Sequence, residues 1–129
     1  MNYKVPDERL IVFIIKKVIK EKGIINSQRE FLSLVLRELK QSGIDYRLNG
    51  TRLRKIAINK AGVKVEIEYR ETDANSKDLK ICPVCGNKLL EIHNLTLEGN
   101  KVPVGKRCTR CPYWTGLTKR VPRRYIFMR

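Results

Sequence analysis

Long apolar stretches are missing from this sequence of 129 residues. The longest unbroken apolar run, residues 10–15, has six residues, whereas a membrane-spanning helix needs about 20. The run also follows Asp7 and Glu8, so it lacks the basic flank of a secretory signal. We therefore expect no membrane-spanning segment and a cytoplasmic protein, in which thiols stay reduced.

Residues that commonly carry out catalysis are scarce as well. His93 is the single histidine, and the chain contains no paired-carboxylate motif and no phosphate-binding glycine loop. It therefore offers no catalytic constellation, and we expect a protein that is not an enzyme. His93 lies in a segment with strand character, where a structural side chain is the plainer interpretation than a metal ligand or a proton carrier.

Acidic residues are few relative to basic ones. The chain has 28 Lys and Arg against 13 Asp and Glu, which gives a net charge of +15. Such an excess is typical of proteins with a polyanionic partner, either nucleic acid or an anionic membrane. The basic residues are spread through the chain rather than gathered on one amphipathic helix, which favours nucleic acid.

Four cysteines form two pairs with the spacing Cys82-x2-Cys85-x22-Cys108-x2-Cys111. Two tight turns that each present two thiolates complete a tetrahedron around one ion. A disulfide framework conflicts with the expected reducing compartment, and a redox motif needs only one pair in a βαβ context. The spacing predicts one structural Zn²⁺, although iron in a rubredoxin-like site uses the same ligands. Four thiolates leave no open position for water or substrate, so a catalytic zinc is not expected.

The chain between the two pairs is predicted to be a β-hairpin. Residues 88–98 read as one strand, Gly99 and Asn100 as the turn, and the chain up to Cys108 as the return strand, in which Pro103 indicates an edge or an irregularity. Large apolar side chains are too few between residues 79 and 117 to close a core, so the ion would supply much of the stability. This segment resembles the zinc-ribbon family.

One position departs from that family's pattern. Gly86 follows the first cysteine pair, but Pro112 stands in the same place after the second pair. Because proline has no backbone N–H, it supplies no donor to a nearby thiolate. We therefore expect the second turn to differ from the first, with its ligands unchanged.

The N-terminal half reads as three helices and a strand. A helix that starts near Pro6 and Asp7 carries apolar residues at 10, 11, 14, 15, 18 and 19 and ends at Gly23. A second helix opens with a capping box at Ser27 and Glu30. A third helix is predicted over residues 51–60, and alternating apolar residues then predict a strand at residues 63–70.

The third helix is basic. Arg52, Lys55 and Asn59 recur at i, i+3 and i+7 and share one side of the helix, with Arg54 beside them. A helix with such a side can enter a groove of nucleic acid. Three helices followed by a strand resemble a winged helix-turn-helix, with residues 73–78 as the tip of the wing and residues 79–81 as its return strand.

Together these patterns predict an α+β protein with three parts: a winged helix-turn-helix at residues 1–76, a zinc ribbon at residues 77–117 and a basic C-terminal tail at residues 118–129. The segments "YRLNGTRLRKIA" and "KRCTRCPYWTGLTKRVPRRYIF" are similar to those of a group of small archaeal winged-helix plus zinc-ribbon proteins, usually regarded as transcription regulators. The resemblance implies a DNA-binding regulator with one structural Zn²⁺. Two alternatives stay open, namely a protein bound to ribosomal or other structured RNA and an adaptor that docks on a transcription or translation assembly.

The tail mixes arginines with Tyr125 and Phe127, a combination that can contact phosphates and stack on bases. Tyr113 and Trp114 follow the last cysteine and suit packing and stacking equally well. No pattern specifies a target sequence or an oligomeric state. The candidate nucleic-acid contacts are Arg52, Arg54, Lys55, Asn59, Lys106, Arg107, Arg110, Lys119, Arg120, Arg123 and Arg124.

Overall fold

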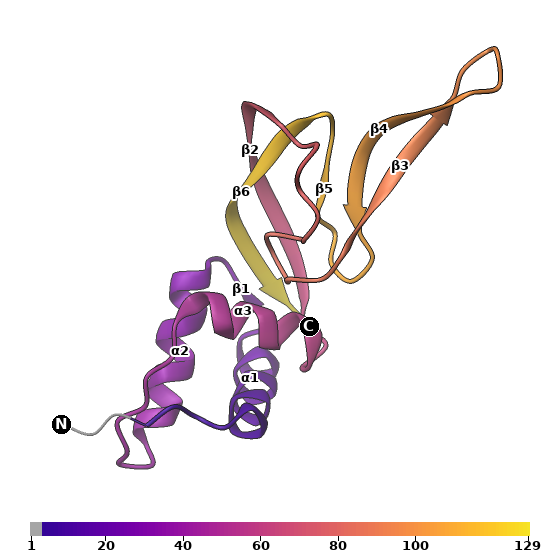
Figure 1. Ribbon diagram of the computed structural model, residues 1–129. Helices are drawn as coiled ribbons and strands as arrows, with labels where there is room; N and C mark the ends of the chain where they lie inside the picture. Colours follow the sequence, from indigo (N-terminus) through magenta and orange to yellow (C-terminus); the bar gives the residue numbers. More distant parts are fainter. Residues whose placement is uncertain (1–3) are drawn as a thin grey trace. The chain divides into compact units, whose positions relative to one another are not determined.

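The computed structural model describes residues 4–129, and these fold into two compact units (Figure 1). The first unit runs to Glu66 and also includes Arg124–Arg129, and the second is Ile67–Arg123. Within the described residues the fold is mixed α+β, with three helices and two three-stranded sheets. Residues 1–3, the start of the predicted first domain, lie outside the described residues.

The first helix, α1 (Glu8–Lys22), begins and ends as its local sequence predicts. The carboxylate of Asp7 accepts a hydrogen bond from the N–H of Arg9 at 2.8 Å and so satisfies a donor of the first turn. Gly23 ends the helix with φ 76°, and its N–H donates to the carbonyl of Ile19. This left-handed conformation suits glycine, which has no Cβ to clash with the backbone.

The other two helices are capped in the same way. In α2 (Gln28–Lys40) the hydroxyl of Ser27 accepts from the N–H of Glu30 at 3.1 Å, so the predicted Ser27 cap is confirmed. In α3 (Gly50–Asn59) the side chain of Asn49 accepts from the N–H of Arg52 at 2.8 Å. Over residues 4–129 no helix has the length and apolar character needed to cross a membrane.

The core of the first unit lies between the three helices and the end of the chain. Its fully buried side chains include Phe31 from α2 and Phe127 from β6 (Thr118–Met128), with ring centroids 4.7 Å apart. The short strand β1 (Ile24–Ile25) pairs antiparallel with β6, which places Ile25 opposite Phe127. The helices add further fully buried apolar side chains, which are Ile11, Ile15, Val35, Leu53 and Ala57.

The C-terminal residues differ from the expected basic tail at 118–129. They form the strand β6, because Phe127 is buried in the core and because β6 pairs with β1. The sheet order is β1-β6-β2, with β2 at Lys64–Asn75. The strand next to β2 is therefore β6 and not the expected return strand at residues 79–81, which form only a bridge from Ile81 to Lys88 just before the first cysteine.

The second sheet holds the hairpin between the cysteine pairs (Figure 1). Its order is β3-β4-β5, with β3 at Leu89–Leu95, β4 at Lys101–Cys108 and β5 at Trp114–Thr115. The register shifts between Ile92 and His93, where the partner residue is Pro103, so the irregularity expected at this proline is present. β4 and β5 approach so closely that a Cβ on Gly105 would collide with the carbonyl oxygen of Thr115.

Candidate metal centre

The four cysteine sulfurs lie together in the second unit. All are within 4.8 Å of one another, with 3.6 Å from Cys82 Sγ to Cys111 Sγ and 3.4 Å from Cys85 Sγ to Cys108 Sγ. A disulfide has an S–S distance of about 2.05 Å, so these are separate thiols. A tetrahedron with bonds of about 2.3 Å has sulfur–sulfur edges of about 3.8 Å. The four cysteines can therefore hold one metal ion.

Each pair of cysteines sits on a turn of the same design. The N–H of Val84 donates to Cys82 Sγ at 3.4 Å, and the N–H of Arg110 donates to Cys108 Sγ at 3.3 Å. In both turns the donor lies two residues after the first cysteine. The backbone N–H of that cysteine donates to the carbonyl five residues later, at 2.7 Å in the first turn and 2.9 Å in the second. These bonds orient the sulfurs of both turns.

Pro112 changes one backbone bond but removes no donor from a sulfur. Gly86 donates its N–H to the carbonyl of Cys82 at 3.0 Å, a bond that Pro112 cannot make in the second turn. Cys111 instead has a backbone hydrogen bond from Tyr113, two residues on. Cys85 correspondingly accepts from the side chain of Asn87 at 3.0 Å. Each cysteine thus has a donor despite the departure from the zinc-ribbon pattern.

The protonation of the thiols reflects their crowding. A hydrogen bond from Cys111 lowers the pKa of Cys82 to about 5, and the same bond, together with burial, raises the pKa of Cys111. Burial raises the pKa of Cys85. Four thiolates this close repel one another, so without a cation the site must keep protons. A divalent cation takes the place of those protons and leaves all four sulfurs as thiolates.

The ligand set fits a structural ion. Four thiolates in tetrahedral reach are typical of zinc and of iron–sulfur chemistry, so the site is compatible with zinc. Among residues 4–129 these cysteines are the one group of three or more potential ligands. His93 is not in it, and its Nε2 lies 3.1 Å from a carboxylate oxygen of Glu91.

The two aromatic residues after Cys111 have different environments. Tyr113 is buried, and its hydroxyl donates to the carbonyl of Arg120 at 2.8 Å. Trp114 is 49% exposed. The guanidinium of Arg120 lies 4.0 Å from the Trp114 ring centroid and 3.8 Å from that of Tyr69. Tyr113 therefore packs, whereas Trp114 keeps a surface open to solvent.

The basic residues predicted on α3 divide in a similar way. Lys55 is exposed and Asn59 is partly buried. Arg52 is partly buried, and its Nη2 donates to the carbonyl of Pro6 at 3.1 Å. Arg54 is only 7% exposed and donates to Gln28 Oε1 at 2.6 Å. A phosphate contact by Arg54 does not fit this placement, because the side chain points into the unit.

The remaining predicted contacts are placed in the second unit and on β6. The ammonium group of Lys106 donates hydrogen bonds to the carbonyls of Lys77 and Leu79 at 2.8 and 2.5 Å. Lys106 therefore fixes the segment before the first cysteine pair. Arg124 is exposed, and its Nε donates to the carbonyl of Asn26 at 2.8 Å. Lys119 and Arg120 are partly buried. The other exposed members of the set are Arg107, Arg110 and Arg123.

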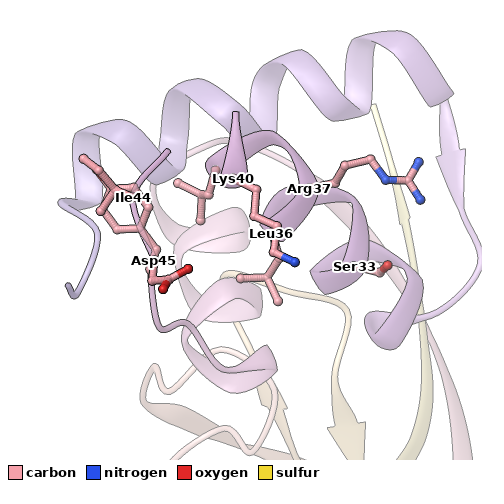
Figure 2. A pocket seen from close by; sticks show the side chains of 8 residues that line it. Ser33, Leu36, Arg37, Lys40, Ile44 and Asp45 are labelled. Atoms are coloured by element: carbon pink, nitrogen blue, oxygen red, sulfur yellow. The ribbon is translucent and has the colours of Figure 1, made fainter. Parts of the chain in front are cut away.

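The first unit has several surface hollows, and two of them border α3 and α2. One, of about 480 Å³, runs along α3 and is lined by Lys55, Asn59 and also Lys60, which the sequence interpretation did not include. Lys60 is the C-cap residue of α3, directly after the predicted contact Asn59, and this place at the helix end could have identified it. The other, of about 370 Å³, lies between α2 and residues 44–46; Figure 2 shows Arg37 extending away from Asp45 there.

Comparisons with protein-family models, curated proteins and solved structures returned no match for this chain.

Proposed function

We propose that this chain is a non-enzymatic nucleic-acid-binding protein of the cytoplasm, and specifically a DNA-binding transcription regulator with a structural zinc. The observation that carries the proposal is that each unit is basic by itself. The first unit has 17 Lys and Arg against 7 Asp and Glu, and the second has 11 against 6. Zinc with four thiolates lowers the second unit's charge from +5 to +3. Both units therefore attract phosphates.

The order of elements in the first unit supports a winged helix. The chain runs helix, strand, two helices and strand, and β6 supplies the last strand, paired to β1. In this interpretation the segment between β2 and β6, which contains all four cysteines, takes the place of the wing loop. The zinc ribbon is then an insertion in the wing rather than a domain that follows it.

The exposed side of α3 is the proposed reading surface. Lys55, Asn59 and Lys60 line its hollow, and Thr51 begins it. An α-helix with its side chains is about 10–12 Å in diameter, which suits the major groove of DNA, about 12 Å wide. Lysines here would contact phosphates and set the orientation, while Asn59 is suited to a base edge.

The ion would act structurally. All four ligands are cysteines, so no position is left for substrate, and the ion would join the turn before β3 to the turn after β4. We propose zinc rather than iron. Elemental analysis of the purified protein decides this, with one zinc per chain as the expected result and iron as the contradicting one.

Binding to labelled duplexes over a range of salt concentrations tests the function. Affinity should fall steeply as salt rises, because phosphate contacts release counterions. Lys55→Gln should reduce the slope of log affinity against log salt by about 1. The matched control is Lys16→Gln, which removes the same charge from the exposed side of α1 and should leave the slope unchanged.

Duplex DNA and duplex RNA of equal length separate the two nucleic-acid hypotheses. Tighter binding of DNA supports the hypothesis of a transcription regulator, whereas tighter binding of RNA supports the hypothesis of a protein bound to structured RNA. Affinity that does not change with salt, or an equal effect of the Lys55 and Lys16 variants, would refute the phosphate-contact mechanism. Absence of nucleic-acid binding together with one stoichiometric protein partner would point to the adaptor.

A further inference from the structure

One face of the β3-β4-β5 sheet carries a row of exposed side chains. Leu90 pairs with Arg107 across β3 and β4, and Arg107 pairs with Trp114 across β4 and β5. Directly opposite residues of antiparallel strands project from the same face. Leu90 is 46% exposed, Trp114 is 49% exposed, and Arg107 between them is exposed. We call these three residues the sheet row.

The acidic neighbour lies on the opposite face of the sheet. Glu91 pairs with Lys106, and Lys106 pairs with Thr115, so this set alternates with the sheet row along the strands. The sheet row therefore presents the flat ring of Trp114 and the aliphatic side chain of Leu90 on either side of one guanidinium, with no carboxylate among its members. Apolar surface next to a single cation matches a ligand that has both a flat ring and a negative charge.

Trp114 is held in place from one side. The guanidinium of Arg120 stacks on its ring at 4.0 Å, and the same group stacks on Tyr69 at 3.8 Å. The Nε of Arg120 is also paired with a carboxylate oxygen of Glu71 at 3.1 Å. These contacts fix the orientation of Arg120 and, through it, of the indole. An aromatic ring that is already positioned loses little conformational entropy when a second ring stacks on it.

We propose that the sheet row binds an unpaired nucleobase, which stacks on the open side of Trp114 while Arg107 contacts the adjoining phosphate. The ligand of the second unit is then single-stranded nucleic acid. This rests on the proposed nucleic-acid function and specifies the ligand of this unit. A base in a duplex is stacked between its neighbours and cannot lie flat on a protein ring, so the sheet row selects single strands.

Trp114 is the only tryptophan of the chain, so its fluorescence reports directly on the sheet row. The zinc-loaded chain of 129 residues is titrated with a short single-stranded oligonucleotide and, separately, with a duplex of the same sequence. Stacking of a base on the indole should quench the fluorescence as the single strand binds. The duplex should quench it much less at the same fraction bound.

Variants test the same contact by affinity. Trp114→Ala should weaken single-strand binding roughly 5- to 150-fold, the effect of losing one stacked base, and leave duplex affinity unchanged. Trp114→Phe keeps an aromatic ring and should retain most of the affinity. Arg107→Gln should reduce the slope of log affinity against log salt for the single strand by about 0.7. The matched control is Leu97→Ala, which removes an apolar side chain that is fully exposed and outside the sheet row.

Zinc content of each variant shows whether the module has folded. If Trp114→Ala loses zinc, its affinity is not informative. The fluorescence quenching of the wild type and the affinity of Trp114→Phe then test the sheet row. Single-strand binding without quenching and with unchanged affinity in the Trp114 variants overturns the sheet row but leaves the proposed function standing. Absence of binding to any nucleic acid at low salt overturns both. A fluorescence change that depends on protein concentration and not on the oligonucleotide would show that the sheet row contacts a second copy of the chain, and it would overturn the proposal.

Discussion

Replacing Phe127 by alanine should destabilise the first unit by about 4 kcal/mol. The ring is fully buried, and its centroid lies 4.7 Å from that of Phe31. A buried aromatic side chain removes about 150–250 Å² from water, at about 25 cal/mol per Å². The methyl group that alanine retains lowers the loss to the range of about 3–5 kcal/mol found for such truncations.

This loss is a large part of the stability of a small domain, which is about 5–15 kcal/mol in total. For a unit of this size it corresponds to a fall in Tm of about 15–30 °C. Urea unfolding followed by the helical circular dichroism signal measures the change. All three helices lie in the first unit, so this signal reports on that unit alone.

Phe13→Ala is the matched control. It makes the same chemical change on α1, but Phe13 is 69% exposed, so the effect should stay within about 0.5 kcal/mol. If Phe127→Ala costs no more than Phe13→Ala, the end of the chain does not belong to the core of the first unit. The assignment of β6 to that unit would then be wrong.

Three further results are expected for the second unit. Removing the metal with a chelator should expose four reactive thiols and unfold the β3-β4-β5 sheet, while the helical circular dichroism signal stays. Thiol titration and circular dichroism measure these changes. Thiols that stay protected after removal of the metal would contradict the expectation. Gly105→Ala should destabilise the metal-loaded unit by about 1–3 kcal/mol, because its Cβ would meet the carbonyl oxygen of Thr115. Gly116→Ala is the control, since nothing lies within 4 Å of a Cβ there; equal effects in a chelator competition would refute this reasoning. Burial raises the pKa of Tyr113, so its contribution to stability is complete below the ordinary tyrosine pKa of about 10 and is lost as the pH rises through the higher folded value. The tyrosinate can no longer donate to the carbonyl of Arg120, and unfolding measured from pH 9 to 12 should show a fall that is smaller in Tyr113→Phe, in which Tyr69 still has a pKa raised by burial.

The features that the sequence determined by itself are local. Helix ends at Asp7, Gly23 and Ser27 follow from hydrogen bonds that span two to four residues, so neighbouring residues suffice to predict them. The candidate metal ligands follow from spacing in the same way. Each Cys-x-x-Cys pair is a turn of a few residues, and the pairing of the two turns needs only one ion.

Other features were decided only by the tertiary structure, because they depend on which distant segments meet. The last strand pairs with β1 through contacts that cross about a hundred residues of chain, such as Ile25 with Phe127, and a basic tail and a core strand have the same local composition. Arg54 and Lys55 are adjacent and both basic, yet one is buried against α2 and the other faces solvent. Trp114 and Thr115, the two residues of β5, differ in the same way, because successive residues of a strand face opposite sides and only the packing decides which side is covered.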